Sequence, residues 1–378
     1  MQKISNKKVL LNRPLIFLLI IGLILRLLGL INIRLGGDFA AYWEIAGQIV
    51  SGRYFPLWST GSSVNPNLHF GPLIYYILTI PYVLGRGDYR AAIIFFALVN
   101  TANIWLIFWT AEILFNRQIG YMAALIYTFS VLAITMDNFP WNYNLIPLCL
   151  LLALYFLIKV RKGHGAFLPL IFVALGIASL LHIIVVLIIP VFILLVPWKK
   201  ICWQSWLAGA VVCLVFLFPY LVQSGQVIKI AVPIRENCSF WSWLRYHGHG
   251  ERCFNQIRNT LFIFRYMSAS LFNTNNILMA GLCFLMTAFL LLKKKLPQRK
   301  MFVIWLGIPF LTLLIYSAGI ALHYYVILFP MPIFLFSLFL TELGKIKRWG
   351  SVFKNILLYS TIFLNLLIYL VSLTAIRI

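Results

Sequence analysis

Acidic residues are scarce in this chain of 378 residues, which has 8 Asp and Glu against 31 Lys and Arg. Charged residues make up only 10% of the sequence and hydrophobic residues 62%. A soluble domain is about a quarter charged and at most about half apolar, so this composition excludes an ordinary soluble fold. Long apolar runs between basic clusters are typical of a polytopic α-helical membrane protein. The same clusters account for the net charge of +23, so we expect no nucleic-acid partner.

The sequence also lacks an internal repeat and a low-complexity linker, which favours one membrane domain over residues 1–378. The apolar run 14–33 is long enough to span a bilayer, and no small-residue cleavage site follows it. We therefore expect a retained signal anchor. Cysteine is sparse, but Cys238 and Cys253 share one predicted external loop, where a disulfide bond is permitted and expected.

Basic clusters predict the topology, because Lys and Arg concentrate on the cytoplasmic side. The clusters fall at residues 3–13, 159–162, 199–200, 293–300 and 345–354. Placing all of them on one side predicts about eleven transmembrane helices, with the N-terminus in the cytoplasm and the C-terminus outside. We expect a multi-pass protein of a prokaryotic plasma membrane.

The first external region follows from the same alternation. The apolar segment 71–85 cannot cross, because residues 34–70 and 86–90 must both be external. It is short and contains two prolines, as expected of a helix lying at the interface. We therefore predict an external region 34–90 with juxtamembrane helices, and a second external loop or lid at 223–272.

Most of the few carboxylates fall on the predicted external side, together with arginines that suit phosphate oxygens. Asp38 and Asp137 each adjoin a helix end. Carboxylates at such depth in a membrane protein usually face a polar cavity. This pattern, with many aromatic residues, favours an external site for a phosphorylated lipid that carries a sugar.

Four stretches of the chain resemble the GT-C glycosyltransferases of the protein O-mannosyltransferase and aminoarabinose transferase type. The first, "GGDFAAYWEIAGQIVSGRYFP", carries an Asp and a Tyr four residues later at the exit of the first helix. The others are "NLHFGPLIYYIL", "GYMAALIYTFSVLAITMDNFPWNYNLIPLCLLLALYFL" and "LHYYVILFPMPIFLF". They occur in the family's order, and they agree with the external region deduced above.

The resemblance implies a membrane glycosyltransferase that moves a hexose or pentose from a polyprenyl phosphate or diphosphate to an external lipid, glycan or protein acceptor. It implies an inverting displacement with Asp38 as the base, while Asp137 is the candidate for a second catalytic acid. The residues expected to bind substrate are Tyr42, His69, Arg86, Arg90, Asn142, Asn144, His182, Arg245, His323 and Tyr324.

This chain departs from the family pattern at two positions. Phe39 stands where a second acid is usual. Aligned on "LALYFL", the family's other acid falls near Asn142 or Asn144 and not on Asp137, so either Asp137 replaces it or that acid is lost. A divalent cation favours paired carboxylates, so we expect no metal and no cofactor, although a cation remains possible.

Two other functions compete with transfer. A flippase or transporter of polyprenyl-linked sugars would show interrupted helices and repeats near the membrane midplane. A non-catalytic scaffold would bind the lipid-linked sugar without transfer. Substitution of Asp38 by Asn separates both from an enzyme.

Overall fold

The computed structural model describes residues 12–32, 35–59, 69, 71–222, 252–274, 276–293, 295–315 and 322–375. These residues form α-helices and short 3-10 helices and no extended strand, which confirms the predicted all-α class. In the first half the α-helices are α1 Arg13–Leu27, α2 Gly37–Val50, α3 Leu73–Leu84, α4 Arg90–Leu114, α5 Arg117–Phe129, α6 Val131–Asn138, α7 Ile146–Arg161, α8 Leu168–Leu181 and α9 Ile189–Leu195.

In the second half they are α10 Trp203–Val222, α13 Arg252–Phe272, α14 Ile277–Leu292, α15 Arg299–Ile315, α16 Met331–Leu343 and α17 Gly350–Ala375. Short 3-10 helices are η1 Leu28–Ile31, η2 Asn142–Leu145, η3 Gly165–Phe167, η4 Ile183–Ile188, η5 Trp198–Lys200 and η6 Leu322–Leu328.

Several helices are long and apolar enough to cross a bilayer, so the chain is a multi-pass membrane protein. Within the described part of the chain four single spans meet this test, or up to six spans in all if each of two bent helix pairs is one span. The single spans are Arg13–Ile31, Arg90–Leu114, Asn142–Arg161 and Gly350–Thr374. Shorter apolar helices occupy several of the other predicted spans, and the number of about eleven crossings stays a prediction.

One apolar stretch of the chain, residues 117–138, forms a bent pair of helices. Its two parts, α5 and α6, meet at 64° with Ser130 between them. The Ser130 hydroxyl accepts a hydrogen bond from the backbone N–H of Ala133 and donates one to the Ser270 carbonyl of α13. These bonds replace the helical bonds lost at the break, because Ser is a favourable N-cap. The bend places Asp137 in the last turn of α6.

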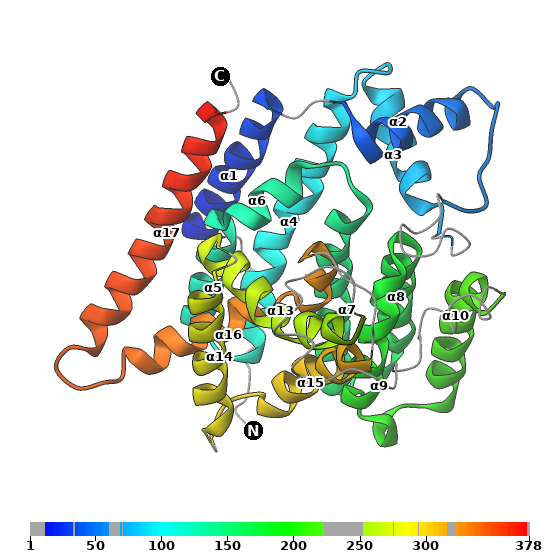
Figure 1. Ribbon diagram of the computed structural model, residues 1–378. Coiled ribbons are helices and arrows are strands. Elements are labelled where there is room, and N and C mark those ends of the chain that lie inside the picture. The colour runs from blue at the N-terminus through cyan, green and yellow to red at the C-terminus, as the bar shows by residue number, and fades with distance from the viewer. Residues whose placement is uncertain are drawn as a thin grey trace.

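The predicted external region 34–90 contains two short helices that pack against each other, α2 and α3. They lie together at the upper right of the molecule, beside the upper end of α4 (Figure 1). Helix α3 has 12 residues and is therefore about 18 Å long, well short of the ~30 Å core of a bilayer. Its length agrees with the prediction that this segment does not cross.

The predicted cytoplasmic clusters come together at one end of the helices. Arg161 at the end of α7 donates a hydrogen bond to Gln298 at the start of α15. Lys293 after α14 and Lys345 after α16 both bind the carboxylate of Glu342. Contacts between clusters that are far apart in the sequence support their predicted placement on a common side.

The last 21 residues of the predicted loop 223–272 are helical. They form α13, in which Ile263 and Met267 are buried in the core. The role of the loop as a lid stays a prediction. Residues 223–251 lie outside the described residues.

Candidate functional site

Asp38 lies in the first turn of α2 with its side chain exposed. The indole N–H of Trp141 donates a hydrogen bond to Asp38 Oδ2 at 3.2 Å. Gly37, with φ of +54°, allows the chain to turn into α2 directly before the carboxylate. The helix N-terminus favours a negative charge here, so the carboxylate is held at an accessible position.

An aromatic cluster lies beside Asp38, formed by Trp141, Tyr143, His182, His323 and Tyr324. Neighbouring ring centroids are 4.5 to 5.4 Å apart, from Tyr143 and His323 at 4.5 Å to Tyr143 and Tyr324 at 5.4 Å. The rings come from three regions: the start of η2, the end of α8, and η6. The predicted residues His182, His323 and Tyr324 are thus brought together, joined to Asp38 by Trp141.

Tyr42 lies one helical turn after Asp38 and is buried, with its ring 5.4 Å from that of Tyr75. Burial and the neighbouring Asp38 carboxylate raise the pKa of the Tyr42 phenol well above its ordinary value. The phenol therefore stays protonated at neutral pH. It can donate a hydrogen bond to a substrate, but it cannot act as the base.

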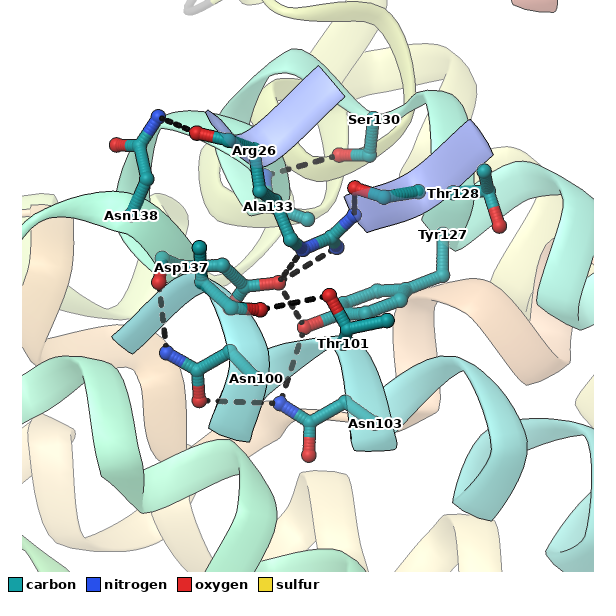
Figure 2. A network of polar contacts seen from close by, with 12 residues as sticks. Arg26, Asn100, Thr101, Asn103, Tyr127, Thr128, Ser130, Ala133, Asp137 and Asn138 are labelled. Carbon is teal, nitrogen blue, oxygen red and sulfur yellow. Dashed lines mark hydrogen bonds and ion pairs between the residues drawn. The ribbon is translucent and has the colours of Figure 1, made fainter. Parts of the chain in front are cut away.

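Asp137 lies in a different environment, a buried polar network between α1, α4, α5 and α6 (Figure 2). Its Oδ2 accepts hydrogen bonds from Arg26 Nη2 at 2.6 Å, from Arg26 Nε at 2.9 Å and from the Tyr127 hydroxyl at 2.6 Å. Asn103 donates to the Tyr127 hydroxyl, and Asn100 donates to the Asp137 carbonyl. The ion pair is fully desolvated, so loss of either partner would leave an uncompensated buried charge.

A cavity of about 160 Å³ lies between this network and the aromatic cluster. Asp137 and Tyr127 line it on one side, Tyr143 and His323 on another, and Tyr266 of α13 on a third. Most of its wall is apolar.

The two predicted asparagines of η2 are buried and hold the backbone around the cluster. Asn142 Nδ2 donates to the Leu181 carbonyl at 2.9 Å, directly before His182. Asn144 Nδ2 donates to the Phe139 carbonyl at 2.7 Å and its side chain lines the cavity. Asn142 Oδ1 is buried and accepts no hydrogen bond from the described residues.

The other predicted substrate residues lie further from Asp38. His69 Nδ1 lies 3.0 Å from the Ser59 carbonyl, and Gly71 after it packs against the Leu180 backbone, near His182. Arg86 and Arg90 are exposed between α3 and α4, and Arg90 forms an ion pair with Asp88 that lowers the pKa of that carboxyl. None of the described contacts joins either arginine to the aromatic cluster.

The side chains of three predicted residues are not described. Arg245 and Cys238 lie outside the described residues, and for Cys253 only its position in α13 is described, so the disulfide bond stays a prediction. Among the described residues, no three His, Cys, Asp or Glu side chains gather as metal ligands. Independence from a metal remains a prediction as well.

The residues of the site that were not selected from the sequence include Arg26, Tyr127, Trp141 and Tyr143. Arg26 carried a usable signal, because a charged residue inside the apolar run "LIIGLILRLLGL" implies a buried partner. Trp141 and Tyr127 carried none, since aromatic residues are frequent throughout this chain.

A comparison with known families points to the predicted class of enzyme. Residues 69–222 match the model of the dolichyl-phosphate-mannose-protein mannosyltransferases, which confirms the resemblance to GT-C membrane glycosyltransferases. The matched segment includes α3 to α10 and with them Asp137, the η2 residues and His182. It indicates sugar transfer from a polyprenyl-phosphate donor in general. No curated protein matches the chain at a significant level.

Proposed function

We propose that this protein transfers a sugar from a polyprenyl phosphate or diphosphate to an acceptor on the extracytoplasmic side of the membrane, with Asp38 as the base. One observation carries the proposal: the exposed Asp38 carboxylate is hydrogen-bonded to Trp141 at the edge of the aromatic cluster. Aromatic faces suit the apolar faces of sugar rings, and a carboxylate beside them is placed to accept a proton from an acceptor hydroxyl.

The reaction is an inverting displacement at the anomeric carbon. The acceptor oxygen forms the new bond to this carbon as its proton passes to Asp38, and the bond to the phosphate oxygen breaks. Polyprenyl phosphate, or the diphosphate, leaves with the bonding electrons. Because phosphate is a good leaving group, no general acid is needed, but positive charge is needed near the leaving oxygen.

Arg258 is a candidate for that positive charge. It lies on α13 with its side chain exposed and its guanidinium 5.8 Å from the centre of the Phe262 ring. That ring lies 6.1 Å from the ring of Tyr325 of η6, the residue after Tyr324. The Tyr325 hydroxyl donates a hydrogen bond to the backbone carbonyl of Asn259, which fixes α13 against η6. An arginine here can contact a phosphate whose sugar lies on the aromatic cluster.

The test compares Asp38→Asn with Glu44→Gln. Both residues are exposed carboxylates of α2, but Glu44 contacts only Gln48 among the described hydrogen bonds. Purified variants are incubated with polyprenyl-phosphate sugars and acceptor lipids, and products are measured by mass spectrometry. We expect Asp38→Asn to lower the transfer rate by about 10³-fold, with Glu44→Gln unchanged.

The same measurement distinguishes the competing functions. Full transfer by Asp38→Asn would remove Asp38 from the chemistry. An absence of transfer by the wild-type protein, together with movement of the lipid-linked sugar between leaflets of a vesicle, would favour the flippase instead. Binding without either activity would indicate a scaffold.

A further inference from the structure

Two contacts join the same pair of chain segments at different depths. The deeper contact is the ion pair between Arg26 of α1 and Asp137 of α6. The outer contact is the hydrogen bond between Asp38 and Trp141. Asp38 follows Arg26 along one segment, and Trp141 follows Asp137 only four residues later along the other. The two segments are therefore in contact at the ion pair and again at Asp38, the proposed base.

The segments also touch between these two contacts. Asn138 Nδ2 donates to the Arg26 carbonyl at 3.1 Å, and Gly29 packs so closely on the Asn138 amide that no side chain fits there. Further out, the rings of Phe39 and Phe139 lie 6.0 Å apart. Because these contacts are continuous, a shift at the ion pair would be transmitted to Asp38.

Asp137 is poorly placed to react itself. Three donors converge on Oδ2, two from Arg26 and one from Tyr127, and Asn100 fixes the backbone of the same residue. A carboxylate held in this way is committed to its partners. Asp137 lines the cavity, but its charge is already balanced by the guanidinium of Arg26.

We propose that Arg26 and Asp137 are positioning residues, whose ion pair sets the place of the Asp38 carboxylate against Trp141 and the aromatic cluster. The role rests on the proposed function of Asp38 as the base. A positioning role differs from a catalytic role of Asp137. In a positioning role the ion pair acts by holding α1 against α6, and the Asp137 carboxylate takes no part in the reaction.

Two variants separate these roles. Asp137→Asn leaves the Arg26 charge buried without its partner, so α1 and α6 must shift. The double variant Arg26→Met with Asp137→Leu replaces both charged groups by apolar side chains, so no buried charge is left without a partner. We expect Asp137→Asn to lower kcat by about 10²-fold with KM within about threefold, because a misplacement of about 1 Å costs this much. The double variant should recover to within about fivefold of the wild type.

A second readout does not depend on activity. The full chain is labelled with fluorotryptophan, and the ¹⁹F resonance of Trp141 is assigned with Trp141→Phe. Asp38→Asn marks the shift that accompanies loss of the hydrogen bond. We expect Asp137→Asn to move the Trp141 resonance in the same direction and the double variant to return it. Ser337→Ala, a buried change in α16, serves as the control and should leave it unchanged.

Two results would overturn the positioning role. One is a wild-type Trp141 resonance in Asp137→Asn; the other is a folded double variant with a restored resonance but no activity, which would make Asp137 itself a reactant. If Asp137→Asn does not accumulate, Arg26→Met takes its place, since it breaks the same ion pair and leaves a carboxyl that can take up a proton; the same shift of the Trp141 resonance is expected. If the wild type shows no transfer, the proposed function fails. The ¹⁹F resonance of Trp141 still shows whether the Arg26–Asp137 ion pair sets the position of Asp38 against Trp141.

Discussion

The indole N–H of Trp141 and the carboxylate of Asp38 form a hydrogen bond of 3.2 Å between residues that are 103 positions apart. The bond links helix α2 to the turn that follows α6. It also links the carboxylate to the aromatic cluster, because the Trp141 ring lies 4.9 Å from that of His323.

Trp141→Phe should lower kcat about tenfold. The change removes the N–H donor but keeps an aromatic ring beside His323, and a hydrogen bond to a charged group is worth about 1.5–3 kcal/mol. Transfer kinetics measure the effect. Trp105→Phe is the control, because Trp105 stacks on Trp109 in α4, away from Asp38, and should give wild-type rates.

Tyr42→Phe should leave the shape of the pH–rate profile unchanged. The pKa of this phenol is raised above its ordinary value of 10.0, so it carries its proton throughout the range in which the enzyme is assayed and contributes no ionisation there. Its neutral form stabilises the folded state fully below about pH 10, and this contribution is lost only at higher pH. If the acidic or alkaline limb of the pH profile of kcat/KM is lost in the variant, Tyr42 does not stay protonated throughout the assayed range.

Gly29→Ala should destabilise the protein by about 2 kcal/mol, as overpacking commonly does. A Cβ at this position would lie 2.0 Å from Asn138 Nδ2, and that amide cannot retreat without losing its bond to the Arg26 carbonyl. Thermal unfolding in detergent provides the measurement. Gly36→Ala has open space around its Cβ and should unfold within a degree or two of the wild type.

Arg258→Ala should raise KM for the lipid-phosphate donor by about tenfold with little change in kcat, because the guanidinium is proposed to bind phosphate in both the ground state and the transition state. Arg265→Ala is the matched control on the same helix, since both guanidinium groups lie over the Phe262 ring. Equal effects of the two substitutions would argue that α13 only packs and that Arg258 has no phosphate contact.

Much of the composition of the site could be predicted from the sequence. The distribution of Lys and Arg predicts that the helix ends that carry His182 and His323 share one side of the membrane. The resemblance added Asp38 and Tyr42. These inferences use local pattern alone, and the structure brings His182, His323 and Asp38 to the aromatic cluster, with Tyr42 one helical turn after Asp38.

The partner of Asp137 could not be predicted in the same way. Its ion pair with Arg26 joins residues 111 positions apart, and such pairing depends on how α1, α5 and α6 pack. The break at Ser130 was also hidden, because the apolar run continues through it and the hydrogen bond that stabilises it comes from α13. Tertiary contacts, and not local propensity, determine both features.

Helix α17 completes the end of α1. The Tyr369 hydroxyl donates to the Leu25 carbonyl, and Asn32 Nδ2 donates to the Leu373 carbonyl, so the ends of these helices lie together at the top of the molecule (Figure 1). Arg26 directly follows Leu25. Two hydrogen bonds thus make the last helix of the chain a direct support for the end of the helix that carries Arg26, although their partners are 344 and 341 positions apart.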